Sequence, residues 1–203
     1  MWSGDFEFTI NTTIFNRIPF HKQVNEILGD FTSTILLAVD WTKTTFRERA
    51  KTLQSQLLED LDHYHFNGVN VLREMARLKG QRTVLMPIVF TSTIYEDSSS
   101  FESLGKYVFG ISQTPQVWLD CQIYESEGNL IVHWDSLVDL FPKGMIEDMF
   151  EAYGNLLTRL ADEDAWTIPS REYLLPKWHQ SILSSVNDTT VPLQGKTHIR
   201  IHN

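Results

Sequence analysis

The chain contains a single cysteine, Cys121, among its 203 residues. One cysteine excludes an internal disulfide and a metal site built from several thiolates. This usage fits a reducing compartment, so we expect a cytoplasmic protein. Because Cys121 falls on the apolar side of a predicted strand, we interpret it as a small buried hydrophobic residue and not as a nucleophile.

Positive charge is scarce, since 17 lysines and arginines stand against 26 aspartates and glutamates and give a formal net charge of −9. The cations are scattered, which disfavours nucleic-acid binding, because neutralising phosphates needs clustered Lys and Arg. Anionic membrane surfaces and polyanionic ligands are disfavoured for the same reason. No apolar run approaches the roughly 20 residues of a membrane span, and residues 1–20 lack the apolar core of a signal peptide. We therefore expect a soluble chain with no nucleic-acid or membrane partner.

Motifs of several enzyme classes are also missing. The phosphate-binding loops GxGxxG and GxxxxGK[ST], the nucleophile elbow GxSxG and the zinc motif HExxH do not occur. The densest metal-like group, Asp62-His63-Tyr64-His65, has its two histidines two residues apart at the end of a predicted helix, where they point to different sides. We predict no metal and no organic cofactor within this chain.

What the sequence does contain is enough apolar material, 42% of residues, for one sizeable core. Alternation of apolar and polar residues predicts strands at residues 6–14, 32–41 and 82–92, and a hairpin within 112–135 that turns at Glu127-Gly128-Asn129. A period of 3.6 residues predicts helices from residue 45 to 66, over 69–80, 142–160 and 170–185, with a short helical stretch at 21–28. Pro87 suggests that the third strand is an edge strand or carries a bulge. The order predicts an α/β fold, an α+β layered sandwich with helices packed on a sheet.

Two places in this pattern offer polar chemistry. Thr91 and Ser92 end an apolar strand, and the ends of such strands commonly face ligand crevices. In the predicted hairpin, the apolar residues Val117, Leu119, Cys121 and Ile123 alternate with Trp118, Asp120, Gln122 and Tyr124. Asp120 is the candidate acid. On periodicity alone, a half-buried aspartate in a strand is more often a hydrogen-bonded structural residue than a catalyst, so both interpretations stay open.

Three segments resemble the motifs of one family. They are GDFTSTILL (Gly29–Leu37), PIVFTSTI (Pro87–Ile94), and SQTPQVWLD followed after thirteen residues by WD (Ser112–Asp135). These are similar to motifs of the heterocyclization domain, the variant of the condensation domain in nonribosomal peptide synthetases. The third match is the most specific, because many fixed residues and the thirteen-residue gap coincide. The first departs at Thr34, where the family usually has an apolar residue.

The resemblance covers residues 5–186 and implies one half of a two-lobed fold. A full domain of this family has two lobes, each resembling chloramphenicol acetyltransferase, with the active-site tunnel between them. The family's DxxxxD motif and the HHxxxDG motif of ordinary condensation domains belong to the N-terminal lobe, and neither occurs here. Residues 1–186 would then form the C-terminal lobe, and residues 187–203 a linker or disordered tail.

The resemblance also implies roles for individual residues. In the family, the aspartate of TPQVxLD and the threonine of PVVFTS line the tunnel and are implicated in cyclodehydration, and the matching residues here are Asp120 and Thr91. We expect Asp120 to act as general acid/base and Thr91 to orient it or the hemiaminal oxygen. The residues expected to bind substrate or support the site are Gln116, Ser92, Trp118 and Gln122, and we expect Gln116 to lie on the same strand face as Asp120. Asp30, Trp134 and Asp135 also match motif positions, and we interpret them as structural.

The family reaction joins a carrier-bound acyl group to a Cys, Ser or Thr held on a carrier protein, then closes a thiazoline or oxazoline ring with loss of water. The implied partners are the N-terminal lobe, peptidyl carrier proteins that bring phosphopantetheine-tethered substrates, and a downstream adenylation domain. Without the N-terminal lobe we expect the isolated chain to be inactive. The alternative is a truncated, non-catalytic module that binds a carrier protein or a synthetase partner. A trimeric acetyltransferase of the same broad fold is disfavoured, because its catalytic histidine motif is missing.

Overall fold

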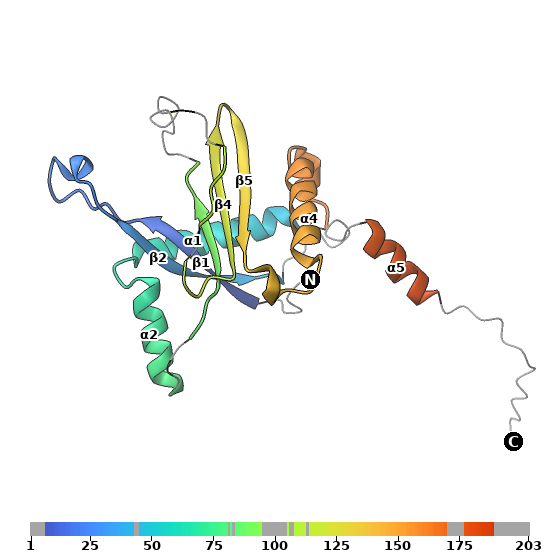
Figure 1. The fold of residues 1–203 in the computed structure, drawn as a ribbon, viewed down its shortest axis with the longest axis horizontal. Helices are drawn as coiled ribbons and strands as arrows, with labels where there is room; N and C mark the ends of the chain where they lie inside the picture. The colour runs from blue at the N-terminus through green and yellow to red at the C-terminus, as the bar shows by residue number, and fades with distance from the viewer. Residues whose placement is uncertain are drawn as a thin grey trace, which may run out of the picture.

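A five-stranded mixed sheet, in the order β2-β1-β3-β4-β5, forms the centre of the structure. The computed structural model describes residues 7–42, 45–80, 84–94, 108–112, 114–169 and 177–188, with residues 82 and 105. The strands are β1 (Glu7–Phe15), β2 (Thr32–Asp40), β3 (Ile88–Ser92), β4 (Leu119–Ser126) and β5 (Asn129–Ser136). Strands β1 and β2 form one antiparallel hairpin and β4 and β5 another, and β3 runs between them parallel to both β1 and β4. Figure 1 shows the two hairpins crossing at a steep angle, so the sheet is strongly twisted.

The helices lie on both faces of this sheet. The α-helices are α1 (Phe46–Asp62), α2 (Gly68–Lys79), α4 (Met145–Leu160) and α5 (Lys177–Asn187), and the 3-10 turns are η1 (Val24–Glu26), η2 (Val138–Leu140) and η3 (Glu163–Trp166). α1 and α4 cover the apolar face, α2 begins against the opposite face of β2, and α5 lies away from the sheet (Figure 1). Among the described helices, none is long and apolar enough to cross a membrane.

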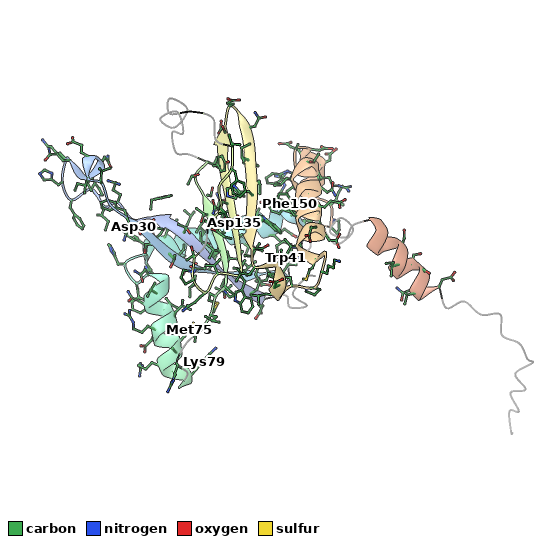
Figure 2. The ribbon with its side chains drawn as sticks, viewed as in Figure 1. Asp30, Trp41, Met75, Lys79, Asp135 and Phe150 are labelled. Atoms are coloured by element: carbon green, nitrogen blue, oxygen red, sulfur yellow. The ribbon has the colours of Figure 1, made fainter. Side chains whose placement is uncertain are left out.

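The core lies on the face covered by α1 and α4. Its buried residues are Ile35, Leu37 and Val39 of β2, Leu119 and Ile123 of β4, and Ala152 of α4. On the same face Trp134 of β5 contacts the rings of Phe150 and Tyr153 at centroid distances of 5.3 and 5.5 Å, and Figure 2 shows Phe150 on α4 beside this part of the sheet. The strand alternation predicted from the sequence is therefore confirmed, and it places Thr91 of β3 and Asp120 and Gln122 of β4 on the opposite face.

Local sequence explains where several elements begin and turn. Thr45 caps α1 with a capping box, in which its hydroxyl accepts from the Glu48 N–H at 3.3 Å and the Glu48 carboxylate accepts from the Thr45 N–H at 3.3 Å. Glu127 (φ 51°) and Gly128 (φ 74°) form the β4–β5 turn, and two successive positive φ angles are the requirement of a type I′ hairpin.

The start of α2 approaches β2 closely. A Cβ atom on Gly68 would lie 2.8 Å from Thr34 Oγ1 and 3.2 Å from the Thr34 carbonyl oxygen. Thr34 is the position at which the sequence departs from the family motif, and here it faces a helix start that only glycine can supply at this distance. Thr34 therefore fits at this position because α2 begins with a glycine, which has no side chain to clash with it.

Three predictions from the sequence need correction. The third strand begins at Ile88 and not at residue 82, and β3 is central, so Pro87 marks neither an edge nor a bulge. Proline has no N–H for the ladder, so the strand starts just after it, while the Pro87 carbonyl accepts from the Trp118 N–H at 2.8 Å. The helical stretch at 21–28 is only the three-residue turn η1. The last helix is described from Lys177, and residues 170–176 and the predicted tail beyond residue 188 lie outside the described residues.

Candidate functional site

Asp120 is a buried carboxylate held from one side only. Its side chain is 9% exposed, and Oδ2 accepts from Gln122 Nε2 at 2.8 Å and from Ser112 Oγ at 3.1 Å. Oδ1 is also buried, but it has no hydrogen-bond partner among the described residues. A buried polar atom without a partner is costly, and native structures contain few of them. Asp120 is therefore positioned by Gln122 and Ser112, while the hydrogen-bonding capacity of Oδ1 is not used by the described residues.

A second carboxylate stands directly opposite. Asp135 of β5 is the register partner of Asp120, and like charges in this relation destabilise a strand pair. Ser112 connects the two, because its N–H donates to Asp135 Oδ2 at 2.8 Å while its hydroxyl donates to Asp120 Oδ2. Gln122 Nε2 also donates to Ser112 Oγ at 3.1 Å. These four residues form one hydrogen-bonded group on the polar face.

Thr91 lies on the same face, on the neighbouring strand. The register pairs Thr91 with Gln122 and Val89 with Asp120, so Thr91 is the diagonal neighbour of the acid. A strand spacing of about 4.8 Å and a rise of about 3.3 Å per residue give roughly 8 Å between the two Cα atoms. Across β1, the Thr91 hydroxyl donates to Thr13 Oγ1 at 3.0 Å. The acid and the hydroxyl are therefore diagonal neighbours on one face of the sheet.

Only some of the other predicted site residues lie beside Asp120 on the same face of the sheet. Gln122 contacts Asp120 as described, whereas Ser92, the next residue after Thr91, belongs to the opposite face by strand alternation and pairs with Ile123. The prediction that Gln116 shares a strand face with Asp120 is wrong, because Gln116 lies in the turn before β4 with φ 70°. Trp118 also precedes β4, and its side chain is 39% exposed.

Sequence reasoning missed two residues that contact the predicted site. Ser112 opens the motif that carries Asp120, but its contact with the acid depends on how the chain folds back before β4. Thr13 lies 78 residues from Thr91 in the sequence, and no local sequence pattern predicts that β1 and β3 are neighbours in the sheet. The only available signal was that Thr13 falls on the polar side of an alternating strand.

The residues interpreted as structural have structural contacts. Asp30 Oδ1 accepts from the Thr32 N–H at 2.8 Å at the start of β2, and the hydrogen bonds with Thr32 lower the pKa of Asp30. Figure 2 shows Asp30 far from Asp135. Trp134 Nε1 donates to Cys121 Sγ at 3.1 Å. Burial, more than any neighbour, raises the pKa of the Cys121 thiol to about 11, which leaves it protonated and unreactive.

Other parts of the described structure offer no competing site. His63 caps the end of α1, and the described ranges contain no group of three or more metal-ligating side chains. A hollow of about 750 Å³ opens between α1 and the sheet, lined mostly by apolar residues such as Ile10, Leu53 and Phe90. None of the predicted site residues lines it. Because the apolar residues that line the hollow belong to the core face of the sheet, we interpret the hollow as incompletely filled core space.

Apolar side chains are exposed close to the acid in the sequence. Ser112 ends the described 108–112 segment, in which Val108, Phe109 and Ile111 are 88%, 80% and 77% exposed. Large apolar side chains presented together to solvent commonly mark a surface that another protein unit covers. The segment is anchored to the polar face through Ser112.

Comparisons with known proteins place these features in a family. No protein-family model matches the sequence. Pyochelin synthetase PchF of Pseudomonas aeruginosa is 45% identical over 171 residues, which cover 82% of this chain and 10% of that protein. Phenyloxazoline synthase MbtB of Mycobacterium tuberculosis is 36% identical over 195 residues, which cover 93% of this chain and 14% of that protein. The chain therefore spans a small part of these curated relatives.

Solved structures agree. The nonribosomal peptide synthetase FmoA3 matches with a TM-score of 0.83 and 36% identity over 94% of this chain and 22% of that chain. The cyclization–docking bidomain of EpoB from Sorangium cellulosum matches with a TM-score of 0.71 and 43% identity over 82% of this chain and 34% of that chain. The first condensation domain of the CDA synthetase, with a TM-score of 0.59 and 17% identity, covers 81% of this chain and 37% of that chain and shares the fold alone. The fold is therefore the chloramphenicol acetyltransferase-like fold of condensation domains, and the chain belongs to the heterocyclization-domain family of nonribosomal peptide synthetases.

Proposed function

We propose that this chain is the C-terminal lobe of a heterocyclization domain. The domain would condense a carrier-bound acyl group with a carrier-bound Cys, Ser or Thr and then cyclodehydrate the product to a thiazoline or oxazoline. The observation that carries the proposal is Asp120, a buried carboxylate with one oxygen fixed by Gln122 and Ser112 and the other without a partner in the described part of the chain. A purely structural aspartate would gain from satisfying both oxygens.

The proposed chemistry uses Asp120 for two proton transfers. The sulfur or oxygen nucleophile attacks the carbon of the new amide, and its proton passes to the former carbonyl oxygen, which gives a cyclic hemiaminal. As the C=N bond forms, the Asp120 carboxylate takes the proton of the ring nitrogen. It passes this proton to the hemiaminal hydroxyl, which leaves as water, so Asp120 ends as the carboxylate that it was at the start. General acid–base help of this kind contributes roughly 10²–10⁴ to a rate.

The surroundings of the acid support a partner lobe. Several large apolar residues that precede Asp120 in the sequence have exposed side chains, namely Val108, Phe109, Ile111 and Trp118. A second lobe that covered them would exclude water from the reaction. The substrates would arrive on peptidyl carrier proteins through phosphopantetheine arms, and an adenylation domain would load the downstream carrier. PchF is a pyochelin synthetase, MbtB is a phenyloxazoline synthase and EpoB contains a cyclization–docking bidomain, and these relatives support the assignment.

The test separates the two chemical steps in an intact domain that contains this chain. Asp120→Asn should leave amide formation within about twofold and lower ring closure by roughly 10²–10⁴. Intact-protein mass spectrometry of the downstream carrier distinguishes the linear from the cyclised product by the mass of one water. Asp139→Asn, which removes an exposed carboxylate from η2, is the matched control. Equal loss of both steps would contradict the role of Asp120, and normal ring closure would favour the non-catalytic binding module.

A further inference from the structure

Thr91 is tied to a single hydroxyl on a strand distant in sequence. Its hydroxyl donates to Thr13 Oγ1 at 3.0 Å, and both side chains are half-buried. The register of β1 and β3, which pairs Asn11 with Val89 and Thr12 with Phe90, makes Thr13 and Thr91 neighbours on the face that carries Asp120. Both side chains are β-branched and therefore stiff about χ1, so this contact fixes the Thr91 oxygen in space.

The hydrogen bond to Thr13 leaves the Thr91 oxygen able to accept a further hydrogen bond. A hydroxyl has one hydrogen to donate and two lone pairs to accept with. The Thr91 oxygen therefore keeps a lone pair for a donor on a bound substrate, whichever of the two threonines supplies the hydrogen between them. The hemiaminal hydroxyl is a donor of the required kind, and its own lone pairs then remain for the proton that Asp120 supplies.

We infer that Thr13 is a positioning residue for ring closure, because its hydroxyl holds the Thr91 oxygen in place and so presents that oxygen as an acceptor to the hemiaminal hydroxyl. This inference rests on the proposed function. Thr13 does not touch the reacting atoms and acts through Thr91. Amide formation, which needs no hemiaminal, does not depend on this contact.

The experiment uses an intact domain that contains this chain and measures amide formation and ring closure separately. Thr13→Val removes the hydroxyl and keeps the β-branched shape. Thr13→Ser keeps the hydroxyl and removes the methyl group. Thr13→Ala removes both groups and shows whether an effect of valine comes from its packing. Thr9→Val is the matched control, since Thr9 lies on the same strand and faces the same way but has no register partner on β3. Thr91→Val and the double variant with Thr13→Val complete a cycle.

The expected result is selective. Thr13→Val and Thr13→Ala lower ring closure roughly 3- to 10-fold, the factor that one hydrogen bond supplies to a rate, while amide formation stays within twofold of wild type. Thr13→Ser and Thr9→Val remain close to wild type. In the Thr91→Val background, Thr13→Val has no further effect, because the two residues act as one unit.

The contrary outcomes distinguish a failure of the role of Thr13 from a failure of the proposed function. If Thr91→Val impairs ring closure and Thr13→Val does not, the positioning role of Thr13 is wrong and the proposed function stands. Additive effects in the double variant, or equal loss of both chemical steps in the Thr13 variants, also overturn it, since they indicate a separate or purely structural role. If Thr91→Val and Asp120→Asn both close the ring normally, the proposed function fails and this inference fails with it.

Discussion

Asp120→Asn should stabilise the chain while it abolishes ring closure. The substitution keeps the size and shape of the side chain. The amide oxygen replaces Oδ2 and still accepts from Gln122 Nε2 and Ser112 Oγ, which lie 2.8 and 3.1 Å away. The amide nitrogen replaces Oδ1, the buried oxygen that has no partner among the described residues. What disappears is a buried negative charge that faces Asp135 across the strand pair.

The size of the gain follows from these contacts. A buried polar group without a partner costs about 1–3 kcal/mol, and a neutral amide is less costly to bury than a carboxylate. Removing the like charge opposite Asp135 adds a few tenths of a kcal/mol. We expect the free energy of unfolding to rise by about 1 kcal/mol, which for a chain of this size raises Tm by about 2–4 °C.

Urea denaturation of the 203-residue chain at pH 7, followed by tryptophan fluorescence, measures this difference directly. Asp139→Asn is again the control, because it removes an exposed charge and should change the free energy of unfolding by less than about 0.5 kcal/mol. A loss of 1 kcal/mol or more in Asp120→Asn would refute the reasoning, because the fold would then depend on the negative charge. A gain in stability joined to a loss of ring closure is the pattern of a residue kept for activity.

Four further predictions concern Cys121, the cap of α1 and the β4–β5 turn. Because burial raises the pKa of the Cys121 thiol from 9.0 to about 11, iodoacetamide at pH 8 should alkylate the native chain on the order of 100-fold more slowly than the unfolded chain; equal rates would contradict this burial. The folded thiol keeps its proton to a higher pH than the unfolded one, so the free energy of unfolding should fall as the pH rises from about 9 to 11, and this fall should be smaller in Cys121→Ala. Thr45→Ala removes the capping box of α1 and should lower the free energy of unfolding by about 1 kcal/mol in urea denaturation, whereas Thr45→Ser should change it little. Gly128→Ala forces a side chain into φ 74° and should cost about 1 kcal/mol by the same assay, whereas Gly154→Ala, in a helix with open space around the glycine, should not destabilise.

The sequence predicted the parts of the site that depend on local pattern. Alternation along residues 117–124 places Asp120 and Gln122 on one face and Cys121 and Ile123 on the other, and the structure pairs them accordingly. The β4–β5 turn was predictable for the same reason, since two positive φ angles favour a glycine-containing dipeptide. The family motifs then selected Asp120 among the chain's many carboxylates.

The remaining features depend on pairings that no local pattern encodes. Pro87 predicts an edge strand, yet β3 is central. The proline is compatible with a central strand because β3 begins one residue after it. Gln116 was assigned to the strand that follows it, but a turn with positive φ intervenes. The partnership of Thr13 with Thr91 requires β1 and β3 to lie side by side, and this follows only from the complete sheet.

The central position of β3 also has a consequence for folding kinetics. The β1–β2 and β4–β5 hairpins are joined by short or moderate connections and can pair locally, whereas β3 forms only parallel pairings with strands far away in sequence. Closing such long loops is slow, so the hairpins should gain their amide protection first and β3 last. Thr13, Thr91 and Asp120 then meet only in the final docking step, and a chain that has folded both hairpins still lacks its site.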